Sequence, residues 1–79
     1  MEQIFYMMKD ILLELEKEGY KISRPTFQEY EKNGLILPSQ NYAIMSNGRE
    51  VRLYTKEEVK MNAERIIAFI KQKRARTLL

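Results

Sequence analysis

Cysteine and histidine are both absent from this chain of 79 residues. Without cysteine there are no disulfides, and without either residue type there are no zinc sites built from thiolate and imidazole ligands. The missing histidine also removes the commonest acid–base and triad chemistries. The remaining carboxylates and lysines form no recognisable catalytic arrangement with a glycine-rich loop. We therefore expect neither an enzyme nor a protein that holds a metal or another cofactor.

Long apolar runs are missing as well. No stretch approaches the ~20 residues that a membrane-spanning helix needs. The apolar N-terminus follows Glu2 instead of a basic segment, so it does not resemble a secretory signal. The length suits a single domain, near the lower limit of what folds without disulfides or metals. We expect one domain over residues 1–79, cytoplasmic and without membrane contact.

Charge is unevenly distributed along the chain, with a net value of +3. Residues 1–20 carry five acidic and two basic side chains, residues 21–55 three acidic and five basic, and residues 56–79 three acidic and seven basic. The basic excess therefore begins after residue 20. A mildly basic balance of this kind permits binding to nucleic acid without requiring it.

The segment 22–38, ISRPTFQEYEKNGLILP, contains a short helix with start and stop residues of its own. Ser23 is a suitable N-cap, because its hydroxyl can accept a hydrogen bond from a free N–H of the first turn. Pro25 fits the first turn, where a missing N–H costs nothing. Gly34 stands where a helix end favours a left-handed residue, and Pro38 stops the apolar exit. We predict a helix over residues 24–33, too short to be stable alone and therefore held by other parts of the chain.

The N-terminal segment 1–20 has the spacing of an amphipathic helix. Apolar residues recur at steps of three and four, which predicts a helix at about 3–18 that ends before Gly19. Its first turns, around Phe5, are apolar on every side. We favour the interpretation that these early residues add contacts to the core, and the alternative is a surface for self-association. The apolar stripe consists of Ile4, Met8, Ile11 and Leu15.

The pair Asn47-Gly48 is the strongest short-range indication of a β-hairpin. A two-residue loop of type I′ predicts strands at 41–46 and 49–54, with one apolar face that packs on the helices. That face would consist of Tyr42 opposite Leu53 and Ile44 opposite Val51, and the other face of Ala43, Met45, Glu50 and Arg52.

A capping box begins the last helix, because Thr55 is followed three residues later by Glu58. We predict this helix from Lys56 to about Arg76, within the segment 55–77. Its basic end is interpreted first as a solvated tail that suits the helix dipole, with a phosphate contact or a continuation into a dimerisation helix as alternatives. The predicted core stripe is Val59, Ala63, Ile66, Ile67 and Ile70, and the basic end carries Lys71, Lys73, Arg74 and Arg76.

These elements follow the order of a winged helix-turn-helix: a long helix, a short connection with a glycine, a short capped helix, a hairpin and a final helix. The order and its accompanying residues resemble the DNA-binding domain of MerR-type transcription regulators. The resemblance covers residues 22–70 and implies a mainly α fold with a small β-hairpin as the wing. The matching residues are Ser23, Thr26, Phe27, Tyr30, Glu31, Gly34, Leu35, Ile36, Pro38 and Ser39, and then Asn47, Gly48, Arg52, Leu53, Tyr54, Thr55, Glu57, Glu58 and Val59.

The resemblance implies a transcription regulator, or a phage- or plasmid-type factor, of bacterial or phage origin. Such a protein would bind double-stranded DNA, as a homodimer at least on the DNA. The helix at 24–33 would enter the major groove, where arginine pairs with guanine and glutamine with adenine, while the wing contacts the phosphate backbone. The candidate DNA-binding residues are Ser23, Arg24, Thr26, Gln28, Tyr30, Lys32, Arg49 and Arg52.

Two departures from the family pattern weaken the expected contact with DNA. Pro25 stands where the family usually has a basic residue, and Gln28 and Glu29 stand where it usually has arginine and tyrosine. Because binding depends on neutralising phosphates, a single copy should bind weakly. Glu29, the acidic first segment and its apolar start favour an alternative: a protein-interaction module on a winged-helix scaffold that does not bind DNA.

Overall fold

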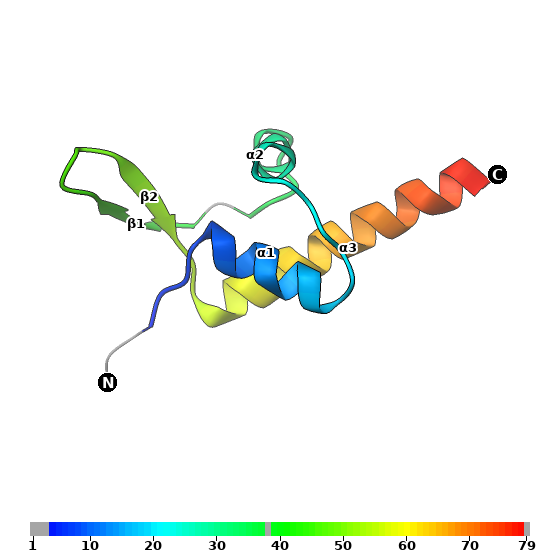
Figure 1. Ribbon diagram of the computed structural model, residues 1–79, viewed down its shortest axis with the longest axis horizontal. Helices are drawn as coiled ribbons and strands as arrows, with labels where there is room; N and C mark the ends of the chain where they lie inside the picture. The colour runs from blue at the N-terminus through cyan, green and yellow to red at the C-terminus, as the bar shows by residue number, and fades with distance from the viewer. Residues whose placement is uncertain (1–3, 38, 79) are drawn as a thin grey trace.

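The structure, a computed structural model, describes residues 4–37 and 39–78, with side chains up to Ala75 in the last helix. It contains the helices α1 (Met8–Lys17), α2 (Arg24–Lys32) and α3 (Lys56–Leu78), and the strands β1 (Asn41–Ile44) and β2 (Glu50–Leu53). The strands form an antiparallel hairpin, so the chain is mainly helical with a small β component, as predicted. The hairpin projects from one end and the last turns of α3 from the other, along a longest dimension of 48 Å (Figure 1). None of the helices within the described ranges has the length and apolar character that a membrane crossing requires.

Helix α2 confirms the predicted short helix and both of its ends. The backbone N–H of Thr26 donates to Oγ of Ser23 at 3.3 Å, and the two hydroxyl groups hydrogen bond at 2.9 Å. At the other end Gly34 has a φ of +79°, and the N–H of Leu35 donates to the carbonyl oxygen of Tyr30 at 2.9 Å. This Schellman motif needs a residue that tolerates the left-handed conformation. The stop predicted at position 38 lies outside the described residues.

Helix α1 is shorter than predicted, because it begins at Met8 instead of near residue 3. The carboxylate of Asp10 accepts a hydrogen bond of 2.7 Å from the N–H of Met7, which caps the helix at this point. The residues before it are extended, since Tyr6 forms two backbone hydrogen bonds, of 2.8 and 2.7 Å, with Tyr54 after β2. Helical spacing alone does not reveal this pairing, which joins two distant parts of the chain.

Of the early apolar residues, Tyr6 and Met8 are half-buried against the core, whereas Ile4 and Phe5 are not part of it. Ile4 is 70% exposed and Phe5 is 38% exposed. The favoured interpretation of these residues as core contacts is wrong for both, because an extended segment does not share the buried face of the helix. Ile11 and Leu15, from the same apolar stripe, are fully buried as predicted.

The hairpin loop has three residues instead of the predicted two. The N–H of Met45 donates to the carbonyl oxygen of Arg49 at 2.8 Å, which leaves residues 46–48 in the loop. Gly48 has a φ of +82°, but Asn47 does not have the positive φ that a type I′ turn demands of both central residues. The loop is a type I turn followed by a left-handed glycine, so the type I′ prediction is wrong.

This longer loop shifts the pairing by one residue and exchanges the faces of one strand. Tyr42 lies opposite Arg52 and Ile44 opposite Glu50. Tyr42 and Ile44, predicted to face the helices, are 55% and 70% exposed. Val51 lies on the other face and is half-buried, as are its neighbours Ala43 and Leu53. The predicted single apolar face is therefore split between the two sides of the hairpin.

Helix α3 begins at the predicted capping box. The N–H of Thr55 donates to the Glu58 carboxylate at 2.8 Å, and the N–H of Glu58 donates to the Thr55 hydroxyl oxygen at 3.1 Å. The helix continues to Leu78, slightly past the predicted end. Its basic end is not only solvated, because the guanidinium of Arg74 lies 5.4 Å from the centre of the Tyr20 ring in a cation–π contact.

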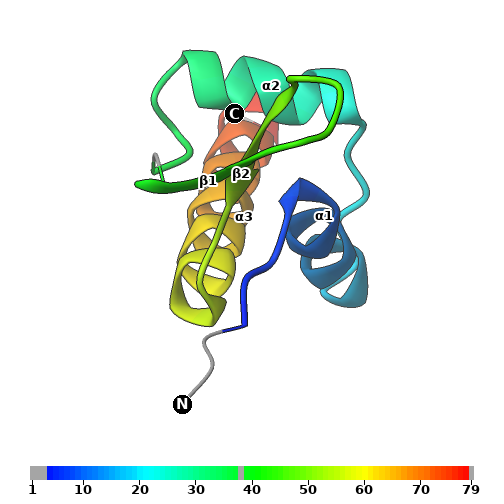
Figure 2. The ribbon, with the colours of Figure 1, turned by 90° about the vertical axis from the view of Figure 1, so that its left-hand side faces the viewer.

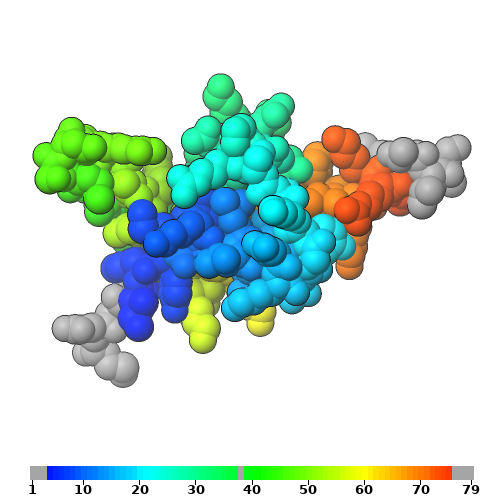
Figure 3. Space-filling view, in the orientation of Figure 1, coloured from blue at the N-terminus to red at the C-terminus, as the bar shows by residue number. Residues whose placement is uncertain are grey.

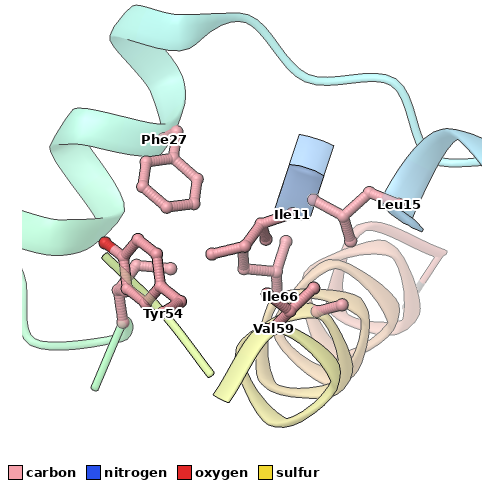
Figure 4. Close-up of a cluster of buried hydrophobic side chains, with 8 residues drawn as sticks. Ile11, Leu15, Phe27, Tyr54, Val59 and Ile66 are labelled. Carbon is pink, nitrogen blue, oxygen red and sulfur yellow. The ribbon is translucent and has the colours of Figure 1, made fainter. Parts of the chain in front are cut away.

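One hydrophobic core joins the three helices. Helix α1 lies alongside the first half of α3, and α2 crosses above both (Figure 2). The rings of Phe27 and Tyr54 lie beside each other, next to aliphatic side chains of α1 and α3 (Figure 4). The predicted stripe of α3 is confirmed, with Ile67 and Ile70 half-buried at its edge. The buried apolar residues are Ile11, Leu15, Phe27, Ile36, Tyr54, Val59, Ala63 and Ile66.

The segment after α2 is held by polar contacts that the sequence patterns do not predict. Asn62 is fully buried on α3, and its side-chain oxygen accepts a hydrogen bond of 2.9 Å from the N–H of Leu37. Nε of Arg65 donates to the carbonyl oxygen of Leu35 at 2.7 Å. Ser39, also buried, donates its hydroxyl to the last carbonyl group of β2. Together these contacts position α2 and the base of the hairpin on α3.

Candidate nucleic-acid interface

Helix α2 presents its predicted DNA-binding residues on two different sides. Arg24 and Gln28, one turn apart, lie on the side toward the hairpin. Thr26 and Tyr30, also one turn apart, lie on the side toward α3 and are half-buried. The Tyr30 ring packs edge-on against Phe69, with 5.5 Å between the ring centres. The residues predicted on this helix therefore do not form one continuous surface.

The remaining predicted residues of this segment lie at the ends of α2. Ser23 uses its hydroxyl in the N-cap, together with that of Thr26, so a ligand of either hydroxyl would compete with the cap. Lys32 is exposed in the last turn, and Glu29 is exposed near the middle of the helix. This mixture of charges keeps the outer surface of α2 from being uniformly positive.

A groove of about 430 Å³ lies between α2 and the hairpin, closed at one end by the start of α1 (Figure 3). We call it the cationic groove. Four of the eight predicted DNA-binding residues line it: Arg24 and Gln28 from α2, and Arg49 and Arg52 from the hairpin. With Lys9 the groove has four cations against two carboxylates, those of Glu31 and Glu50.

The two hairpin arginines differ in how free they are to bind a ligand. Arg49 is exposed beside the loop. Nη1 of Arg52 donates to the carbonyl oxygen of Ser39 at 3.0 Å, which ties β2 to the segment before β1. A guanidinium has five N–H donors, so Arg52 keeps donors for a ligand. Loss of Arg52 would also loosen the hairpin, and Arg49 is therefore the cleaner reporter of a phosphate contact.

The outer edge of β2 adds backbone donors to the same groove. Tyr54 pairs with Tyr6 through the N–H and C=O groups that point away from β1. Because this direction repeats at every second residue of an antiparallel strand, the N–H groups of Arg52 and Glu50 point the same way. Both residues line the groove. An anion in the groove can therefore accept hydrogen bonds from backbone as well as from side chains.

Tyr54 and Glu31 also line the groove. Burial, and then the carboxylate of Glu31, raises the pKa of Tyr54 from its ordinary value of 10.0 to about 12. The phenol therefore stays protonated to a higher pH than an ordinary tyrosine does. Glu31 places one negative charge beside the arginines, which reduces the attraction of the groove for a phosphate.

The sequence patterns did not predict that Lys9, Met7, Met8 and Met45 would line this groove. Met7 and Met8 are adjacent in the sequence, but their place beside the hairpin depends on the pairing of Tyr6 with Tyr54, which brings the start of α1 to the hairpin.

Comparisons with known proteins found no relative: no protein-family model matches the chain, and no similar curated protein or solved structure was found.

Proposed function

We propose that the chain is a MerR-like DNA-binding domain of the winged helix-turn-helix type, in which α2 enters the major groove and the hairpin contacts the phosphate backbone. The shared groove carries this proposal, because Arg24 and Gln28 on one wall face Arg49 and Arg52 on the other. Side chains that suit base edges thus lie beside side chains that suit phosphates. A recognition helix with an adjacent wing requires this arrangement.

The N-terminal half of α2 supplies the groups for reading bases. Arg24 is its first residue and Gln28 follows one turn later on the same side. Arginine donates a bidentate pair of hydrogen bonds to guanine, and glutamine pairs with adenine. The positive dipole at the start of a helix favours a nearby phosphate. In α2 this attraction comes from the dipole, because Pro25 has no N–H and the N–H of Thr26 is used by the Ser23 cap. This end of α2 is therefore the part that we expect to approach the DNA most closely.

Acidic residues limit the affinity of a single copy. Glu31 and Glu50 lie in the groove, and Glu29 is exposed on α2. Since phosphate neutralisation provides most of the sequence-independent affinity, tight binding would need two copies on a two-fold site. The proposal therefore includes a homodimer, formed at least on DNA, and a role in transcription regulation or in a phage or plasmid DNA complex.

Binding of duplex DNA at several salt concentrations tests the proposal, with a selected site and a scrambled one. Arg24→Ala should weaken binding to the selected site by about 1–3 kcal/mol and reduce the preference between the duplexes. Arg49→Ala should weaken the binding of both duplexes alike. It should also reduce the slope of log affinity against log salt concentration by about one unit. Neither change should lower the melting temperature, because both side chains are exposed.

Gln28→Ala and Tyr30→Ala form a matched pair on the two sides of α2. Gln28→Ala should reduce the sequence preference and keep the stability of the fold, because this side chain is exposed. Tyr30→Ala should lower the stability through the lost contact with Phe69 and keep the preference. Failure of the wild type to bind any duplex even at low salt would falsify the proposal.

An interaction module that does not bind DNA is the second candidate, and the outer face of the hairpin favours it. Tyr42 and Ile44, two residues apart on one face of β1, are 55% and 70% exposed. Neighbouring exposed apolar side chains are typical of protein–protein contacts. The duplex experiment separates the two candidates: Ile44→Thr should leave DNA binding unchanged if the domain reads DNA, whereas an interaction module retains no duplex at all.

A further inference from the structure

The cationic groove has an apolar floor that contact with DNA does not require. Three of the chain's five methionines, Met7, Met8 and Met45, line the groove. Phe27 and Tyr54 also border the groove but are only 1% and 2% exposed. Phosphates are bound by cations and N–H groups and gain nothing from such a floor. Methionine side chains are flexible and polarizable, so they adapt to apolar ligands of different shapes.

A second groove, between α1 and the start of α3, provides a contrast. It is larger, at about 570 Å³, but its charges are balanced. Its acids are Asp10, Glu14 and Glu16, and its bases are Lys17, Lys56 and Lys60. The excess of cations over carboxylates therefore distinguishes the cationic groove from this second hollow.

We propose that the cationic groove also binds a small organic anion, a planar aromatic molecule with one negatively charged group. A volume of about 430 Å³ is suited to a molecule of this size. The ring system would lie on Met8 and Met45, and the charged group would contact Arg24 and Arg49. Because the same arginines belong to the DNA interface, the bound anion displaces duplex DNA, and this regulatory part rests on the proposed function.

Charge complementarity selects an anion over a neutral molecule of the same shape. Hydrogen bonds between guanidinium groups and an anionic oxygen are about twice as strong as hydrogen bonds between neutral groups. The backbone N–H of Arg52, on the outer edge of β2, is a further donor in the groove. A neutral aromatic molecule gains only the contact with the floor.

A matched pair of fluorescent probes tests this preference in the absence of DNA: anilinonaphthalene sulfonate, which carries one sulfonate, and uncharged phenylnaphthylamine. The sulfonate should bind about tenfold more tightly than the uncharged probe. Arg24→Gln should reduce that advantage, since Arg49 remains, and should leave the binding of the uncharged probe unchanged. Lys60→Gln removes one positive charge from the second groove and should change the affinity of neither probe. Equal affinity for the two probes, or equal effects of the two substitutions, overturns the proposal.

Amide NMR spectra locate the bound sulfonate probe. It should shift the resonances of Met8, Met45 and Val51 around the cationic groove, and leave those of Leu13 and Lys60 around the second groove in place. Met45→Gln should weaken binding and Met45→Leu should preserve it, because the two changes differ in polarity at an exposed side chain. Shifts centred on the second groove contradict the assignment.

Competition with a labelled duplex tests the regulatory part in the full chain. Saturating sulfonate probe should release the duplex, whereas the uncharged probe should not. If the duplex stays bound while the probe occupies the groove, the regulatory part is wrong. If the probe binds in the groove but no duplex binds at any salt concentration, the proposed DNA function fails and the anion site stands.

Discussion

The side-chain oxygen of Asn62 accepts a hydrogen bond of 2.9 Å from the backbone N–H of Leu37, 25 residues earlier in the chain. Asn62 is fully buried in α3, and Leu37 follows the buried Ile36 at the exit from α2. The bond supplies a partner for a backbone donor that is partly removed from water. It also ties the exit of α2 to α3. The position of α2, and with it one wall of the cationic groove, therefore depends on an amide in the core.

Asn62→Ala should destabilise the fold by about 1–3 kcal/mol, because it leaves the N–H of Leu37 without a partner and removes buried atoms. Thermal and urea unfolding measure the loss. Gln72→Ala is the control, since this amide on the same helix is exposed and its removal should cost less than about 0.5 kcal/mol. Equal stability of the two variants would show that the buried hydrogen bond contributes nothing to the fold.

The observed hairpin register predicts different losses of stability for substitutions at two β-branched residues, Ile44 and Val51. Ile44→Thr should change the free energy of unfolding by less than about 0.5 kcal/mol, because Ile44 is 70% exposed. Val51→Thr should cost about 1 kcal/mol or more, because it places a hydroxyl on the half-buried face. Both changes keep a β-branched side chain, so strand propensity is similar. The register expected from a two-residue loop requires equal losses, and urea unfolding distinguishes the two outcomes.

The buried phenol of Tyr54 should make the fold sensitive to alkaline pH. Its pKa is raised from 10.0 to about 12, mainly by burial and then by Glu31. Because the folded-state pKa lies above the unfolded one, this stabilisation is fully present below about pH 10 and is lost as the pH rises toward 12. The loss should reach roughly 2–3 kcal/mol.

Two tyrosine substitutions isolate this contribution from the other groups that titrate at high pH. The stability of the wild type relative to Tyr54→Phe should fall across that interval, because phenylalanine has no proton to lose. Tyr42 is 55% exposed, so the pH dependence of stability of Tyr42→Phe should match that of the wild type. Urea unfolding at a series of pH values measures the difference, and parallel curves for wild type and Tyr54→Phe would contradict the prediction.

The exposed N-terminal residues form the contact in one of two predicted assemblies, a weak homodimer, and the other is a monomer that pairs only on DNA. Phe5→Glu should keep the stability of the fold within about 0.5 kcal/mol, because Phe5 lies in the extended segment outside the core. It should also convert any dimer into monomer, which sedimentation over a range of concentrations measures. Tyr42→Glu changes an exposed residue of the hairpin and should leave the dimer intact. If Phe5→Glu dimerises like the wild type, the N-terminal contact is wrong.

Four of the eight predicted DNA-binding residues line the cationic groove, and local sequence does not indicate that they share it. The sequence predicts Arg24, Gln28 and Arg49 as DNA-binding residues of a helix and a hairpin, and all three side chains are exposed. Their common groove depends on how the hairpin lies against α2, which no local pattern contains. No local pattern predicts the position of Tyr30 either. Its ring packs against Phe69, which lies 39 residues later in the sequence, where α2 contacts α3.

Local sequence was sufficient to predict the ends of the short helix and the capping box before α3, and composition excludes cysteine and histidine chemistry. Caps act through neighbouring residues such as Ser23 and Gly34, so the local sequence contains the information that they need. Three features became known only from the folded arrangement: the start of α1, the exposed face of the hairpin and the cations that share a groove. These features depend on contacts between distant residues, such as the pairing of Tyr6 with Tyr54. Hydrophobic periodicity indicates which face of a single helix or strand is buried. A pairing between distant segments depends on where the partner segment lies, which periodicity does not indicate.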